Sequence, residues 1–234
     1  MKNHSITIKT LLLPVFCFSF AVSGFSQSKP YWTTGGEIIF SMGNIDYKGD
    51  MNPGLRFAPV FNLQGNLNKD FNKKFGLFTG LALRNVGYIV NGYKDPSDNL
   101  LYKKKFRSYN LGVPLGFKIG TVDQCFFYGG YEVEVAMAYK EKTFEGRDKT
   151  SKITGWFSDR QELFQHGFFA GVQFPYGGNL KFKYYVSEFH NRNFTNSNGV
   201  KPYAGLKTNV FYFSLSFFIF KNTKVYYYHN RSAE

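Results

Sequence analysis

Apolar and polar residues alternate one by one through most of this chain of 234 residues. In residues 106–119, large apolar side chains occupy the odd positions from Tyr109 to Ile119, and small or polar ones occupy the even positions from Ser108 to Lys118. Successive side chains of a β-strand point to opposite faces, so this segment predicts a strand with one apolar and one polar face. One strand of this kind fits a membrane barrel and a soluble sheet equally well.

Eight segments share the pattern, which predicts an all-β protein, an eight-stranded antiparallel transmembrane β-barrel of the outer-membrane type. The connections alternate in length, long at 43–54, 91–105, 140–163 and 191–209 and short at 68–74, 120–125 and 175–179. A barrel with long loops outside and tight turns in the periplasm has this order. The expected strands are 32–42, 55–67, 75–90, 106–119, 126–139, 164–174, 180–190 and 210–220.

Residues 1–27 have the features of a signal peptide. Lys2 and Lys9 precede an apolar run that begins at Leu11, and small and polar residues follow that run. The run is short for a membrane anchor and contains Pro14. We therefore expect export to the outer membrane of a gram-negative bacterium, with a barrel domain at 28–220 and a C-terminal tail at 221–234 that either extends the last strand or hangs in the periplasm.

The composition narrows the functional classes. Lys and Arg number 29 against 16 Asp and Glu, but no nucleic-acid-binding motif accompanies this positive charge. Anionic lipid head groups, including those of lipopolysaccharide, are the expected counter-charge. Cys125 is the only cysteine after the signal peptide, which excludes an intramolecular disulfide and a four-cysteine metal site. We expect no cofactor and no metal.

Strand parity predicts a charged barrel interior. Both signs occur there, so these side chains can pair, whereas a soluble lipocalin-like barrel would have an apolar interior for its ligand. The sequence leaves open whether the charges fill a packed lumen or line a narrow gated pore. The predicted lumenal charge network consists of Glu37, Arg56, Arg84, Lys118, Glu132, Glu134, Lys181 and Lys183.

Aromatic and basic residues mark the expected membrane boundaries. Tyr109 and Tyr139 are expected on the outer face at the loop end, where interfacial aromatic residues belong. Beyond them, a basic run offers a possible contact with lipopolysaccharide phosphates, although a merely solvated charged run fits the sequence as well. That run comprises Lys103, Lys104, Lys105 and Arg107.

His166 and Glu188 give the sharpest hint of catalysis. The turn near Gly177 would set them opposite each other on neighbouring strands, facing lipid. Nucleophilic catalysis needs a hydroxyl or thiol near its base, yet Phe168 follows His166 on that face and Ser187 is expected to point inward. We therefore predict a polar pair at the interface and no catalytic residue.

The stretch Arg-Ser-Tyr-Asn-Leu-Gly-Val-Pro-Leu-Gly-Phe-Lys-Ile-Gly at 107–120 resembles a strand motif of the PorT-like outer-membrane β-barrel family. The resemblance implies a membrane barrel, and some relatives are implied to assist protein secretion, while most have no assigned role. Such barrels commonly end on an aromatic strand, whereas this chain continues past Phe220. We expect a non-enzymatic protein that is structural or accessory to an envelope or secretion complex, with a small-solute channel as the alternative.

Overall fold

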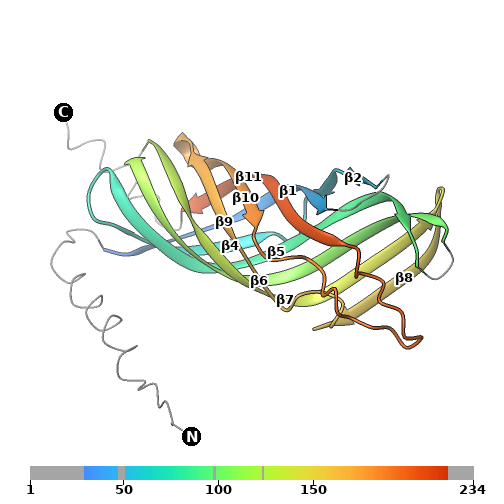
Figure 1. The fold of residues 1–234 in the computed structure, drawn as a ribbon. Helices are drawn as coiled ribbons and strands as arrows, with labels where there is room; N and C mark the ends of the chain where they lie inside the picture. Colours follow the sequence, from blue (N-terminus) through green and yellow to red (C-terminus); the bar gives the residue numbers. More distant parts are fainter. Residues whose placement is uncertain (1–28, 47–50, 97–98, 123, 221–234) are drawn as a thin grey trace, which may run out of the picture.

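The computed structural model describes residues 29–46, 51–96, 99–122 and 124–220, which form an elongated β-barrel (Figure 1). The expected signal peptide at 1–27 and the expected tail at 221–234 lie outside the described residues. Tight turns gather at one end of the barrel, where the described chain also begins and ends. Long hairpins project from the other end, on the right in Figure 1.

Eight of the described strands close into a ring. Each pairs antiparallel with the next along the ring, and the last pairs with the first from Thr33 opposite Phe220 to Asp46 opposite Lys207. This closure confirms the predicted eight-stranded antiparallel barrel and leaves the ring without an open edge. The ring strands are β1 (Tyr31–Asp46), β4 (Leu63–Asp70), β5 (Phe75–Lys94), β6 (Leu101–Thr121), β7 (Cys125–Glu145), β9 (Phe164–Gln173), β10 (Gly178–Tyr185) and β11 (Lys207–Phe220).

The ring has the polarity expected of its sequence pattern. On β6, Leu111, Val113 and Leu115 are exposed on the outside, whereas Asn110 and Lys118 are buried inside. Water-soluble proteins seldom bury Lys, Glu or Arg and expose large apolar surfaces. We call the exposed band the apolar belt; its members include Trp32, Ile38, Leu81, Leu111, Val113, Leu115, Phe117, Ile119, Phe127, Val133, Phe168, Leu180, Phe213, Leu215 and Phe217.

The second expected strand, 55–67, is interrupted. Its first part forms the short β3 (Arg56–Ala58) on β1, its second part is β4, and β2 (Asn52–Gly54) pairs with β5. Pro59 has no N–H to give to a central ladder, and Phe61 lies in the left-handed region at φ 62°. The continuous strand was therefore a wrong prediction, although the even positions Ala58, Asn62 and Gln64 stay buried on both sides of the interruption.

Two segments expected to be irregular loops are β-hairpins. Strands β5 and β6 continue to Lys94 and from Leu101, and β7 continues to Glu145 and pairs with β8 (Asp148–Trp156). Alternation persists in these extensions, but charged residues replace apolar ones on the outer face, as at Lys105 and Arg107. The sequence prediction followed hydrophobicity and so ended the strands too early.

Strand β10 shows the opposite error, because it ends at Tyr185 and not at residue 190. The backbone N–H of Val186 donates to the carbonyl of His166 at 2.9 Å, and the chain then turns away from β9. A short 3₁₀ turn, η2 (Pro175–Gly177), joins β9 to β10 at the turn end. Within the described residues, no helix is long and apolar enough to cross a membrane.

A β-bulge changes the facing of Tyr139. Tyr109 lies opposite Ala138 while Asn110 lies opposite Ala136, so Met137 is an extra residue on β7. An extra residue reverses the alternation beyond it, which turns the Tyr139 side chain inward, where it is 2% exposed. Its predicted position on the outer face is wrong for this reason.

Candidate functional site: the barrel lumen

The centre of the lumen contains paired charges. Arg84 Nη1 on β5 lies 2.8 Å from Glu37 Oε2 on β1, and Lys181 Nζ on β10 lies 2.5 Å from Glu37 Oε1. Glu37 therefore ties three strands together across the barrel. All three side chains are buried.

Two carboxylates of β7 continue this arrangement. Glu132 lies 3.3 Å from Arg84 Nε and 2.7 Å from Lys183 Nζ, and Glu134 lies 2.5 Å from Lys183 Nζ. Removing one partner of a buried ion pair leaves an uncompensated charge, so balanced partners are required here. We call this set the central charge network; it has three carboxylates and three cations among the described residues, namely Glu37, Glu132, Glu134, Arg84, Lys181 and Lys183.

Neutral polar groups complete the network. Arg84 Nη2 donates to Gln64 Oε1 at 3.1 Å, and Asn110 Nδ2 donates to Glu134 Oε2 at 2.7 Å. The Tyr185 hydroxyl donates to both oxygens of Glu134 at 2.9 Å. The search for charged residues in the sequence missed these neutral partners, although their inward parity was the signal that could have found them.

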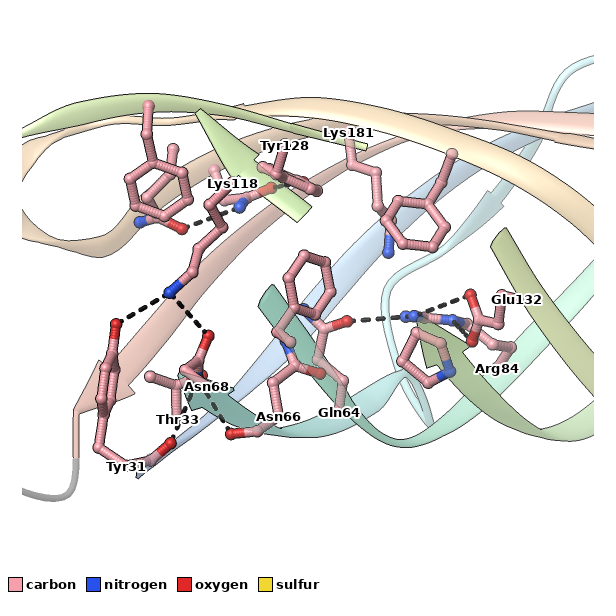
Figure 2. Close-up of a pocket in the computed structure, with 16 residues that line it drawn as sticks. Tyr31, Thr33, Gln64, Asn66, Asn68, Arg84, Lys118, Tyr128, Glu132 and Lys181 are labelled. Carbon is pink, nitrogen blue, oxygen red and sulfur yellow. Dashed lines mark hydrogen bonds and ion pairs between the residues drawn. The ribbon is translucent and has the colours of Figure 1, made fainter. Parts of the chain in front are cut away.

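Lys118 belongs to a second cluster at the turn end. Its Nζ lies 2.6 Å from Asp70 Oδ1 and donates to the Tyr31 hydroxyl oxygen at 3.0 Å and to Asn68 Oδ1 at 3.2 Å (Figure 2). A cavity of about 40 Å³ separates this cluster from the central charge network and is lined by both. This volume holds only a few water molecules, so the interior is packed and not open.

Arg56 does not join the central charge network. It donates to the backbone carbonyl of Asn85 at 3.0 Å and to the Asn85 side chain. It also lines an outer groove with Arg107 and Lys105. Arg56 lies opposite buried Ser41 on β1, so its parity is inward as predicted. Its predicted place in the lumenal charge network is wrong because Asn85 binds the guanidinium away from the lumenal carboxylates.

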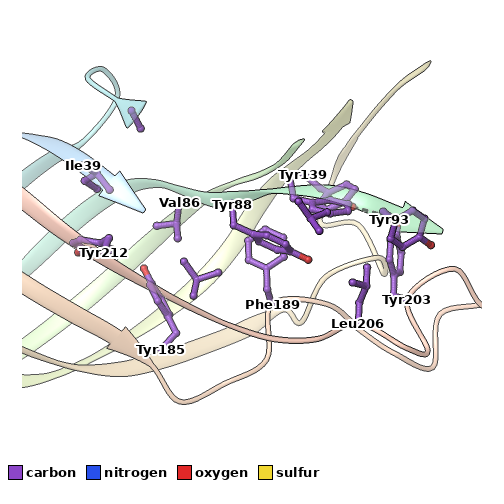
Figure 3. Packing of buried hydrophobic residues seen from close by; sticks show 14 residues of the cluster. Ile39, Val86, Tyr88, Tyr93, Tyr139, Tyr185, Phe189, Tyr203, Leu206 and Tyr212 are labelled. Atoms are coloured by element: carbon purple, nitrogen blue, oxygen red, sulfur yellow. Dashed lines mark hydrogen bonds between the residues drawn. The ribbon is translucent and has the colours of Figure 1, made fainter. Parts of the chain in front are cut away.

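The outer mouth of the lumen is filled by aromatic side chains (Figure 3). The segment between β10 and β11 was expected to be the end of a strand up to residue 190 and a long polar loop from 191. It returns into the barrel mouth and buries Phe189, His190, Tyr203 and Leu206, which we call the mouth plug. The His190 and Tyr203 rings stack with their centroids 4.4 Å apart and an interplanar angle of 10°. Spacing in the sequence gave no sign that this loop would turn inward.

His190 is held neutral in the mouth plug. Its Nε2 lies 2.9 Å from the Tyr88 hydroxyl, and its Nδ1 lies 3.3 Å from the carbonyl of Arg160. Tyr88 is paired with Phe106, the residue next to outward-facing Arg107 on β6. The contact between His190 and Tyr88 therefore lies beyond the apolar belt. Burial lowers the pKa of His190 to about 4. The imidazole is therefore uncharged at neutral pH.

Lys104 anchors the mouth plug from inside. Its Nζ lies 3.1 Å from Glu141 Oε1 and 3.3 Å from Asp95 Oδ2. Glu141 Oε2 in turn accepts hydrogen bonds from Tyr203 at 2.6 Å and from Tyr139 at 2.9 Å. Lys104 was expected to contact lipopolysaccharide, and this prediction is wrong because even positions of β6 face inward. Lys103, Lys105 and Arg107 lie on the outer side and are half-buried.

His166 and Glu188 do not pair. Glu188 Oε2 lies 2.7 Å from Arg192 Nε, and His166 Nδ1 bonds to the Tyr131 hydroxyl. Ser187, expected to point inward, lines an outer groove with both, and its Oγ accepts the backbone N–H of His166 at 3.0 Å. The predicted cross-strand pair is wrong because β10 ends before residue 188. Each side chain is engaged elsewhere, and the contacts do not form a base and nucleophile relay.

Comparison with known proteins gives structural likenesses only. No protein-family model matches the sequence, and no curated protein matches it. Among solved structures, Ail of Yersinia pestis is 12% identical with a TM-score of 0.35, and covers 81% of this chain and 99% of its own. OprG of Pseudomonas aeruginosa is 10% identical with a TM-score of 0.37, and covers 83% and 98%. Neisserial surface protein A is 12% identical with a TM-score of 0.34, and covers 81% and 99%. At such scores these outer-membrane proteins imply nothing about the role of this chain.

Proposed function

We propose that this chain is a sealed, non-enzymatic outer-membrane barrel that is exported through its signal peptide and serves as a structural or accessory component of the cell envelope. The membrane position is supported by the apolar belt, since its Leu, Val and Phe side chains face outward while Glu37, Arg84 and Glu132 are buried. Hydrocarbon favours this arrangement and requires a closed sheet, which the pairing of β11 with β1 provides.

The observation that carries the proposal is the double closure of the lumen. The central charge network spans the barrel from β1 to β7 and β10, and the mouth plug fills the outer entrance. A solute would have to displace both sets of side chains. A steady pore therefore does not fit this interior.

Single-channel recording in planar lipid bilayers tests this proposal. The purified full-length barrel, with insertion verified by heat-modifiable gel mobility, should give no stable conductance steps. A known open porin, inserted in the same bilayer, is the positive control. Large and long-lived steps from the folded barrel would contradict the sealed interior and favour the small-solute channel.

The projecting hairpins support an accessory role. Strand β8 pairs only with β7 among the described strands, so the β7–β8 hairpin extends beyond the ring and presents polar and charged side chains. The PorT-like resemblance at 107–120 agrees with a role beside an envelope or secretion complex. Chemical crosslinking in intact cells, followed by purification of the barrel, should capture envelope proteins. Replacing residues 143–151, the tip of the hairpin, with a two-residue Asn-Gly turn between the paired residues Lys142 and Lys152 should remove these crosslinks while the ring still folds. Unchanged crosslinks would contradict a role for the hairpin.

A further inference from the structure

We infer that the outer face of the β5–β6–β7 sheet, just beyond the apolar belt, is a binding site for the phosphate groups of a glycolipid head group. The inference rests on the membrane position proposed above. A groove of about 290 Å³ lies on this face. Among the described residues, its lining includes five cationic side chains and no carboxylate, in contrast to the balanced lumen. The cations are Arg56, Lys105, Arg107, Lys140 and Lys142.

Strand register assembles these cations. Lys105 lies directly opposite Lys142, and Arg107 lies directly opposite Lys140, on the paired strands β6 and β7. Like charges directly opposite each other on one face of a sheet destabilise it. These two neighbouring outward pairs therefore repel each other's charges, and a bound anion would offset this repulsion.

The groove holds its cations in defined positions. Arg56 is fixed by its bonds to Asn85, and the Arg107 guanidinium donates to the Tyr109 hydroxyl at 3.1 Å. Lys105 Nζ lies 4.9 Å from the centre of the Phe144 ring. Burial, together with the neighbouring charges of Lys103 and Lys142, lowers the pKa of Lys105. A site that is organised in this way does not have to order several long side chains when the anion binds.

The surroundings identify the ligand as a lipid. Phe57 and Ile89 line the same groove, and Phe57 is exposed and packs on Phe40 of the outer barrel wall. A ligand in the groove thus meets apolar side chains beside the cations, and the apolar belt continues below them. This combination matches an amphiphile whose acyl chains lie along the barrel and whose phosphates lie at the head-group level. Lipid A phosphates have this chemistry, and a soluble polyphosphate shares only the cationic half.

Lipid retention measured by native mass spectrometry tests the inference. The barrel is first inserted into phosphatidylcholine nanodiscs, which checks its membrane position independently, and is then supplied with bis-phosphorylated lipid A. We compare the double variant Lys140→Gln and Lys142→Gln with a matched control, Lys201→Gln and Lys207→Gln. The control residues lie just before β11 and at its first position, are exposed, and do not line the groove. Gel mobility verifies that both variants fold.

The wild-type barrel should retain lipid A, and the groove variant should retain it about thirtyfold more weakly, as expected from two cations near an anionic surface. The control variant at Lys201 and Lys207 should lose less than threefold, and dephosphorylated lipid A should not be retained. Equal losses of lipid A in both variants would show that retention comes from diffuse electrostatic attraction and not from the groove, and would overturn the inference. Retention of inositol hexakisphosphate from solution, without retention of lipid A, would overturn the assignment to a lipid.

Discussion

The central charge network and the mouth plug occupy the same lumen and fill it with opposite chemistry. In the network, Glu37, Arg84 and Glu132 are held by ion pairs, and a strand cannot shift without breaking several of them. In the plug, Tyr203 and Leu206 come from a connecting segment and pack against strand residues such as Tyr88. The network therefore belongs to the closed ring itself, whereas the plug is an added part that can open locally while the ring remains intact.

Breaking the network should have the largest effect. Replacing Arg84 with Met leaves Glu37 and Glu132 without their shared cation, which we expect to destabilise the barrel by about 3 to 5 kcal/mol. Urea unfolding in detergent, followed by gel mobility, measures the change. The control is Arg192→Met, which removes a partly exposed ion pair to Glu188 and should cost at most about 1 kcal/mol. Equal losses of stability from the two substitutions would show that burial does not increase the contribution of the network's ion pairs.

Opening the plug should have a smaller and local effect. Replacing Leu206 with Ala removes a buried side chain from the mouth plug and should cost about 2 to 3 kcal/mol, mainly in plug stability. Trypsin should then cut faster at exposed Arg192, while the folded ring keeps its gel mobility. Exposed Leu115 on β6 is the control, because Leu115→Ala should leave cleavage at Arg192 unchanged. Loss of the folded band in Leu206→Ala would contradict the separation of plug and ring.

Acid should loosen the plug before it affects the ring. His190 has an unfolded pKa of about 6.5 and a folded pKa of about 4, so the open form binds a proton first as pH falls. Plug stability is therefore full above pH 6.5 and decreases toward pH 4, by about 1 to 3 kcal/mol. Burial alone would raise the pKa of Glu141, but Lys104 and Tyr203 hold it below its usual value, so Glu141 stays charged in this range.

Trypsin itself loses activity in acid, so this change is measured by hydrogen exchange of residues 186–206 between pH 7 and pH 4.5. The rates are corrected for the pH dependence of intrinsic exchange. The corrected exchange rate of this segment should rise as pH falls. In His190→Gln this additional acceleration should disappear. The same acceleration in the variant would assign the effect to another group.

The smallest effect is expected at His166. Its ring bonds to Tyr131, and Glu188 pairs with Arg192, so His166→Gln should change stability by at most about 1 kcal/mol. Lipid A acylation in cells, measured by mass spectrometry, should be the same as in the wild type. A deacylated lipid A species that is present with wild-type protein and absent with the folded variant would refute the non-enzymatic proposal.

Several features could be read from local sequence because they depend on single strands. Alternation on β6 gave the facing of Leu115 and Lys118, and alternating connection lengths gave an even number of antiparallel strands. Facing failed where the extra residue Met137 broke the period, and it misplaced Tyr139 for that reason. Arg56 kept its inward parity, but its guanidinium bonds to Asn85 and not to the network. Hydrophobicity marks only the part of each strand that lies in the apolar belt. A prediction based on it therefore missed β8 and the charged extensions of β5 to β7.

The sequence by itself determined the barrel class, the polarity of its two faces and the presence of both charge signs inside, because each follows from a two-residue period within a strand. Only the tertiary structure decided which charges meet. Glu37 and Lys181 are 144 positions apart and become partners because β11 joins β1 to β10. It also decided that residues 186–206 close the mouth, since this depends on packing among Tyr203, His190 and Tyr88. Pairing of distant strands and the return of a loop into the lumen are set by the closed ring, which no local period encodes.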